Sequence, residues 1–190
     1  GNMAAGYVYP PLFAILLQPV LSLTFHDALR LWLALNVLLV TLCLALCLRL
    51  FVAGEQRRIV AGIAVVLFLA SMPTRESILL GQANYLILAL CLSAYFVAER
   101  GQRFGAGSLL AAAAWLKVTP AFLLFYFLFH QRSRQVLWGF LATGAIIGVW
   151  IVLLLGFDDI RYYLTHILPA AGEAQLAISN KSFLAMLKRL

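Results

Sequence analysis

The run of residues 28–50 is long enough and apolar enough to cross a lipid bilayer as one helix. At about 1.5 Å per residue it reaches roughly 34 Å, which exceeds the roughly 30 Å of the hydrocarbon core. Further apolar runs follow, so that 64% of all residues are apolar and only 11% are charged. A water-soluble fold of this length could not bury that much hydrocarbon, and long disordered stretches are excluded for the same reason. The chain is therefore expected to be a membrane protein or a piece of one.

The apolar runs predict an all-α, polytopic transmembrane helical bundle that occupies residues 1–190 as a single domain. An interfacial helix is expected over 10–23, where prolines interrupt an apolar run too short for a span. The other expected elements are spans at 28–50, 59–72, 83–98 and 136–155, half-helices at 106–117 and 120–130, a polar connection at 74–82, an extracytoplasmic loop at 156–179 and the start of a further helix at 180–190. Because the chain opens with Gly1 and stops inside this last helix, we expect a fragment of a longer protein.

The segment 105–130 is long enough for one tilted span, but Lys117 and Pro120 lie near its middle. A lysine at the bilayer centre costs at least about 2.5–3.5 kcal/mol, and a proline removes a backbone donor. Thr119 is a good helix cap and Pro120 a good first helical residue. We therefore expect a broken helical hairpin around Lys117 and Pro120.

The positive charges give the expected orientation of this hairpin arrangement. One set of loops holds seven Lys or Arg residues and the other set holds three. The seven are Arg49, Arg57, Arg58, Arg100, Arg103, Arg132 and Arg134, and the three are Arg75, Arg161 and Lys181. The positive-inside rule places the seven in the cytoplasm. A single span through 105–130 gives the same tally, and the hairpin is preferred because the loop at 130–135 contains no acid.

A lysine beside a helix start is typical of an anion site, because the first helical turn offers free N–H donors and the positive end of a dipole. Lys117 and Thr119 fit this pattern, and in a membrane the expected anion is a lipid phosphate. The alternative is a lysine that snorkels to the surface. Arg75 either forms a solvated pair with Glu76 or binds the phosphate in a bidentate manner, through two parallel N–H···O hydrogen bonds.

Other polar side chains near expected helix ends are candidates for substrate contacts. Gln82 and Asn84 stand at the outer end of a span, where amides either bind sugar hydroxyls or cap the helix. Tyr9 is either an ordinary interfacial tyrosine or a wall of a lipid-facing groove. His166, in the long loop, is either a solvated histidine or a functional one.

Several kinds of site have no signal in this sequence. Asp158 and Asp159 follow a glycine and indicate an exposed turn more than a cation site or a base. No zinc spacing, phosphate-binding loop, nucleophile elbow or nucleic-acid pattern is present. We therefore expect no metal, no cofactor and no nucleic-acid partner.

Five short stretches together resemble glycosyltransferase family 87, within the GT-C superfamily of integral membrane glycosyltransferases. They are Tyr9-Pro10-Pro11-Leu12-Phe13-Ala14 with Pro19, Gly81-Gln82-Ala83-Asn84, Lys117-Val118-Thr119-Pro120, Arg132-Ser133-Arg134, and Asn180-Lys181-Ser182-Phe183 with Arg189. Lys181 departs from the glutamine of the family's Asn-Gln-Ser-Leu stretch. The order and spacing of the stretches carry the resemblance, which covers nearly the whole chain.

The resemblance implies a partial GT-C-like fold and a hexosyl- or pentosyltransferase. Such an enzyme moves mannose or a pentose from a polyprenyl-phosphate donor to an extracytoplasmic glycan, polysaccharide or glycolipid acceptor, with inversion. It is a multi-pass protein of the bacterial inner membrane, among membrane lipids, with its active site on the extracytoplasmic side. The donor phosphate would be bound by Lys117, Thr119, Arg75 and His166, and the sugar or acceptor by Gln82, Asn84, Tyr9 and Asn180. The catalytic acid is expected in a first extracytoplasmic loop upstream of Gly1, so it is not assigned to a residue of this chain.

Two other functions stay open on the residues alone. A membrane transporter favours paired broken helices in related halves, and one break is evident in this sequence. A non-catalytic scaffold subunit would use the same motifs for packing only. Sugar transfer from a lipid-linked donor distinguishes the enzyme from both.

Overall fold

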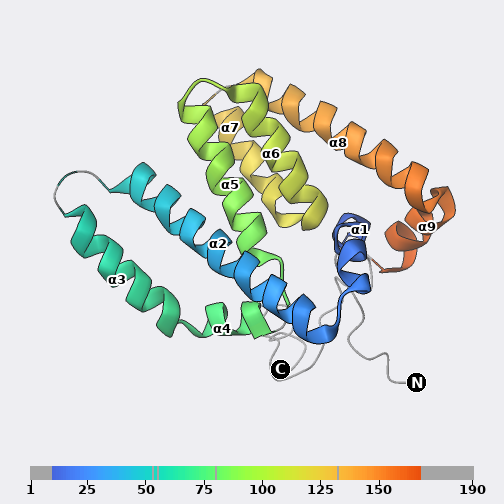
Figure 1. The fold of residues 1–190 in the computed structure, drawn as a ribbon. Helices are drawn as coiled ribbons and strands as arrows, with labels where there is room; N and C mark the ends of the chain where they lie inside the picture. Colours follow the sequence, from blue (N-terminus) through green and yellow to red (C-terminus); the bar gives the residue numbers. More distant parts are fainter. Residues whose placement is uncertain (1–9, 53, 55, 80, 132, 168–190) are drawn as a thin grey trace, which may run out of the picture.

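The chain is helical throughout the part that the structure, a computed structural model, describes, with no strand in residues 10–52, 54, 56–79, 81–131 and 133–167 (Figure 1). Its elements are α1 (Pro11–Leu17), the 3-10 helix η1 (Gln18–Ser22), α2 (Phe25–Phe51), α3 (Arg57–Ala70), α4 (Met72–Leu79), α5 (Asn84–Glu99), α6 (Arg103–Leu116), the 3-10 helix η2 (Thr119–Phe122), α7 (Leu123–Phe129), α8 (Arg134–Leu155), α9 (Phe157–Tyr162) and the π-helix η3 (Tyr163–Ile167). The all-α prediction is confirmed for these residues. Among them, α2 and α8 are long and apolar enough to cross a membrane.

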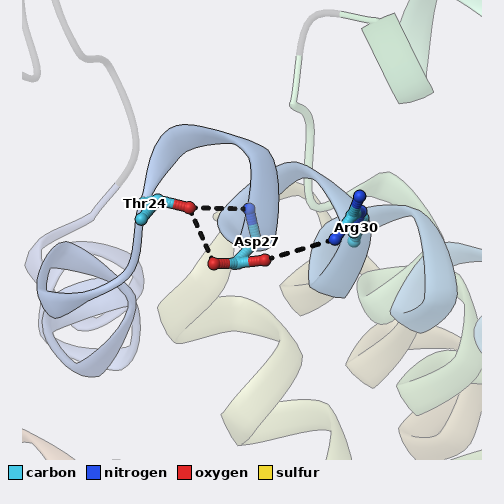
Figure 2. Close-up of polar contacts among 3 residues, drawn as sticks. All are labelled: Thr24, Asp27 and Arg30. Atoms are coloured by element: carbon cyan, nitrogen blue, oxygen red, sulfur yellow. Dashed lines mark hydrogen bonds and ion pairs between the residues drawn. The ribbon is translucent and has the colours of Figure 1, made fainter.

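A side-chain cap sets the start of α2 at Phe25, before the predicted residue 28. The Thr24 Oγ1 accepts the Asp27 N–H at 3.3 Å and donates to the Asp27 carboxylate at 2.7 Å (Figure 2). The same carboxylate lies 3.5 Å from the Arg30 guanidinium. A cap of this kind satisfies a backbone donor that would otherwise be free, and the helix dipole favours an acid in the first turn. Asp27 therefore serves the helix start.

Helices α6 and α8 run side by side in the same direction. Gly107 near the start of α6 lies against the Val136 backbone near the start of α8, and further along Thr143 donates to Ser108 at 2.8 Å. Because both helices begin at the same end, the chain between them has to return, and η2 and α7 make that return (Figure 1). Lys117 stands at the corner with extended backbone, φ −157° and ψ 131°.

The ends of α2 and α5 lie together, because these two helices also run in the same direction. Cys43 Sγ lies 3.7 Å from the Tyr85 carbonyl, and the rings of Phe51 and Tyr95 stack further along at 6.0 Å. The ends of α2 and α5 and the starts of α6 and α8 therefore share one end of the molecule (Figure 1). We call it the basic end, after Arg49, Arg100, Arg103 and Arg134.

A buried cluster at the opposite end joins four helices. Its members are Leu12, Phe13 and Ile15 of α1, Ala83 before α5, Ile87 of α5, Leu116 of α6 and Ile151 of α8. Ala83 and Leu116 directly precede Asn84 and Lys117 in the chain. The packing of apolar side chains thus fixes the backbone on which these two polar residues stand.

Two segments predicted to be loops are helical. Residues 72–79 form α4, because Pro73 lies in the first turn of a helix, where its missing N–H is not needed. Residues 157–167 form α9 and η3, which begin after Gly156 at φ 88°. Asp158 and Asp159 lie in the first turn of α9, where the helix dipole favours carboxylates. The predicted helix at 180–190 lies outside the described residues.

Candidate functional site

Lys117 and Asn84 meet because α5 and α6 are consecutive antiparallel helices. The chain runs along α5, turns at Gly101 with φ 81°, and returns along α6. The start of α5 and the end of α6 therefore lie together, and the Lys117 Nζ donates to the Asn84 Oδ1 at 3.3 Å. The structure thus brings together two residues that were predicted separately, one for the phosphate and one for the sugar.

A helix-ending turn brings Gln82 back over α4. Gly81 has φ 64°, a conformation that costs other residues energy. Its N–H donates to the Ile78 carbonyl at 3.3 Å, and the Gln82 N–H donates to the Ser77 carbonyl at 2.9 Å. These two bonds are those of a Schellman motif, in which a glycine closes the helix and satisfies its last carbonyls. The glycine of the Gly81-Gln82-Ala83-Asn84 stretch therefore has a defined structural role, which is to end α4.

The side chain of Asn84 links this turn to Lys117. Its Nδ2 donates to the Ser77 Oγ at 3.0 Å and to the Gln82 Oε1 at 2.7 Å. We call Ser77, Gln82, Asn84 and Lys117 the Lys117 cluster. Sequence reasoning missed Ser77, because the segment before Gly81 was taken for a loop. The signal that could have found it is Gly81 read as the end of a helix, because Ser77 then lies in the last turn of that helix.

The charge of Lys117 is unbalanced within the described part of the chain. Its side chain is exposed, and the one ion pair among the described residues is Arg30 with Asp27, in α2. The first turn of α5 adds backbone donors, because Ala83 occupies its N-cap and has no side-chain acceptor. An ammonium and an uncapped helix start are both complementary to an anion.

The predicted role of Thr119 as a helix cap is wrong. Val118 occupies the N-cap of η2 without a side-chain cap bond, and Thr119 is the first residue of the 3-10 turn. Regular helix begins only at Leu123, and α7 is seven residues long. The positive helix end beside Lys117 is consequently that of α5. Thr119 keeps an exposed side chain near the corner.

An apolar cavity of about 160 Å³ adjoins the Lys117 cluster. Its walls come from α1, η1, the first half of α2 and the start of α5, and they are almost entirely hydrocarbon. Gln82 lines the cavity and also accepts the hydrogen bond from Asn84, so it stands at the border between the two. A polar, positively charged patch and an apolar cavity that share one residue suit an amphiphilic ligand.

The other predicted site residues lie elsewhere or outside the description. The His166 ring stacks on Tyr162 at 4.7 Å and its Nδ1 lies 2.7 Å from Thr165 Oγ1, and no described bond joins it to Lys117. Arg75 lies in α4, but its side chain is outside the described part, as are Tyr9 and Asn180. Among the described residues, no group of three or more His, Cys, Asp or Glu side chains forms a metal centre.

The comparison with known families agrees with the resemblance found in the sequence. The family model of glycosyltransferase family 87 matches residues 7–190, nearly the whole chain. No curated protein and no solved structure matches the chain. The match includes every residue of the Lys117 cluster, and the members of the matched family are membrane-bound. The chain therefore belongs to glycosyltransferase family 87, a family of glycosyltransferases.

Proposed function

We propose that the enzyme transfers mannose or a pentose from a polyprenyl-phosphate donor to an extracytoplasmic glycan or glycolipid, with inversion at the anomeric carbon. The Lys117 cluster is proposed to bind the donor phosphate. Gln82 and Asn84 lie where the sugar or the acceptor would approach. The protein is proposed to be a multi-pass protein of the bacterial inner membrane.

The observation that carries this proposal is the position of Lys117 next to an apolar cavity. A phosphate on a long hydrocarbon chain needs a cation and an apolar surface within a short distance of each other. Lys117 supplies the cation, and the cavity beyond Gln82 supplies the apolar surface. A nucleotide sugar has no hydrocarbon chain to place there, so the cavity favours the lipid-linked donor.

In the proposed reaction an acceptor hydroxyl attacks the anomeric carbon of the donor sugar. The bond from that carbon to the phosphate oxygen breaks, and the hydroxyl proton passes to a general base. Lys117 stabilises the charge that grows on the departing polyprenyl phosphate. No member of the Lys117 cluster is an acid. The base is therefore proposed to lie outside this cluster.

Replacement of Lys117 tests the proposal in the full-length enzyme. Transfer is measured in membranes from a polyprenyl-phosphate that carries radiolabelled mannose, and separately from the same lipid with arabinose. Lys117→Ala should lower transfer by about 100-fold or more, as the loss of one charge-stabilising donor does. Lys117→Arg should keep part of the rate, since it keeps the charge. Arg103→Ala, at the basic end, is the control and should leave transfer unchanged. Near-normal transfer by Lys117→Ala would reject the proposal.

The proposed orientation has a separate test. The three native cysteines are replaced, and single cysteines are introduced as Thr119→Cys near the corner and Gln102→Cys at the basic end, both exposed positions. A membrane-impermeant maleimide applied to intact cells should label the first variant and spare the second. The reverse labelling would place the Lys117 cluster in the cytoplasm.

A further inference from the structure

The amide of Asn84 has no donor left for a substrate. Its Nδ2 carries two hydrogens, and the Ser77 Oγ at 3.0 Å and the Gln82 Oε1 at 2.7 Å accept them. Its Oδ1 accepts from the Lys117 ammonium. Asn84 is also half-buried at the first turn of α5. A sugar oxygen that accepted a hydrogen bond from this amide would have to displace one of these internal bonds.

The partners of Asn84 also decide which way its amide faces. With the amide reversed, the NH₂ group would point at the ammonium and the oxygen would point at the Gln82 Oε1. Two donors or two acceptors facing each other repel, so the reversed amide is disfavoured on both sides. The observed orientation holds an oxygen towards Lys117. The ammonium keeps its other hydrogens for a second acceptor, since an ammonium has three.

Ser77 holds both of the amide-bearing residues. Its carbonyl accepts the Gln82 N–H, and its hydroxyl oxygen accepts from Asn84. Only 7% of Ser77 is exposed, so it is shielded from competing water. A hydrogen bond of this kind, shielded from solvent, restricts the side chain that it binds. Ser77 itself makes no described contact with Lys117.

We propose that Asn84 and Ser77 are positioning residues that aim the Lys117 ammonium at the donor phosphate. Asn84 acts on Lys117 directly, and Ser77 acts through Asn84. The inference rests on the proposed role of Lys117, and it changes the role expected for Asn84 from sugar binding to alignment. Gln82, whose Nε2 has no hydrogen-bond partner among the described residues, stays the amide available to the sugar.

Single substitutions measure the effect on rate. Asn84→Ala should lower kcat for transfer by about 10- to 100-fold, since a small displacement of a catalytic group has effects of this size. The KM for the acceptor and the ratio of mannose to arabinose transfer should stay unchanged. Ser77→Ala should lower kcat by about fivefold to tenfold, and Ser77→Thr, which keeps the hydroxyl, should restore it. Ser108→Ala is the matched control, because it removes a serine hydroxyl bonded to Thr143, away from the cluster.

Double substitutions separate positioning from a structural role. If Ser77 acts through Asn84, Ser77→Ala should change the rate by less than about twofold once Asn84 is alanine. Likewise Asn84→Ala should have no further effect in the Lys117→Ala enzyme. A residue that only supported the fold would lower the rate again in each of these backgrounds.

The outcomes distinguish this inference from the proposed function. Loss of activity in Lys117→Ala with additive effects of Asn84→Ala, or with a raised acceptor KM or a changed sugar preference, would overturn the positioning role alone. Normal activity in Lys117→Ala would overturn the proposed function itself. If Ser77→Ala does not accumulate in membranes, the Asn84→Ala results in the two Lys117 backgrounds still decide the question, because they do not involve Ser77.

Discussion

The two ends of this all-helical structure hold positive charge in different ways. At the basic end, the Arg100 and Arg49 guanidinium carbons lie 4.2 and 5.6 Å from the Phe96 ring centroid. Both arginines also stand at the C-terminal ends of helices, where the dipole favours a cation. At the other end, Lys117 is held by the amide of Asn84 and lies beside the start of a helix. Lys117 also follows the last residue of a helix, α6, so the difference lies in its surroundings. No ring is described over its ammonium, and the uncapped start of α5 beside it favours an anion. The comparison supports the proposal that the Lys117 end binds the anionic donor.

The ends also differ in how their helices touch. Near the basic end, Gly107 and Gly139 allow the backbones of α6 and α8 to meet. Towards the Lys117 end the indole of Trp115 lies between the same helices and donates to the Gly144 carbonyl at 3.0 Å. Backbone contact cannot adapt, whereas a side chain can shift. Helices α6 and α8 are therefore joined by backbone contact near the basic end and by a side chain towards the Lys117 end.

The largest expected effect comes from a substitution that disrupts the backbone contact between α6 and α8. In Gly107→Ala the added carbon would overlap the Val136 carbonyl oxygen, which is backbone and cannot rotate away. The protein should lose about 3 kcal/mol of stability or more. Gly105→Ala in the same helix meets nothing within 4 Å and should instead gain about 0.5–1 kcal/mol. Thermal unfolding in detergent measures both, and equal stability of the two variants would contradict the backbone contact.

A pair of glycines gives the sharpest comparison of the ends. Gly81 at φ 64° and Gly101 at φ 81° end α4 and α5 with the same pair of backbone bonds, and neither has an atom within 4 Å of an added Cβ. Alanine at either position should cost about 1–2 kcal/mol through backbone strain alone. Transfer should fall by about tenfold or more in Gly81→Ala, because the turn carries Gln82 and Asn84, and should persist in Gly101→Ala. Equal activity losses would mean that strain anywhere lowers transfer.

A smaller effect is expected where a side chain separates the helices. Trp115→Phe keeps most of the ring but removes the bond to the Gly144 carbonyl, which should cost about 1 kcal/mol. Trp138→Phe is the control, because that tryptophan is 63% exposed and its loss should change stability by less than about 0.5 kcal/mol. Thermal unfolding of both variants decides whether the indole bond supports the Lys117 end.

The smallest effect concerns the stacked arginines. Arg100→Gln removes the cation from the Phe96 ring and should cost about 0.5 kcal/mol, with transfer unchanged. Arg103→Gln provides the baseline, because Arg103 is exposed and no ring contact is described for it. A fall in transfer in Arg100→Gln would show that the basic end takes part in the reaction.

The sequence predicted the part of the fold that depends on apolar length and on proline chemistry. The helices over 25–51, 84–99 and 134–155 follow from apolar runs, and the return at Lys117 follows from a charge beside a proline in the middle of an apolar run. Two assignments failed because only one of the possible structural roles of a residue was considered. Pro73 was taken to end a helix although it also suits the first turn of one. Thr119 was taken for a cap although its side chain makes no cap bond.

The sequence by itself determined that this chain is helical, apolar and broken at Lys117, because those properties come from composition and from neighbouring residues. Only the tertiary structure decided that Lys117 reaches Asn84, that Ser77 joins them, and that the cavity beyond Gln82 lies alongside. The physical reason is distance along the chain. Asn84 and Lys117 are 33 residues apart and meet only because two antiparallel helices of similar length return to the same end.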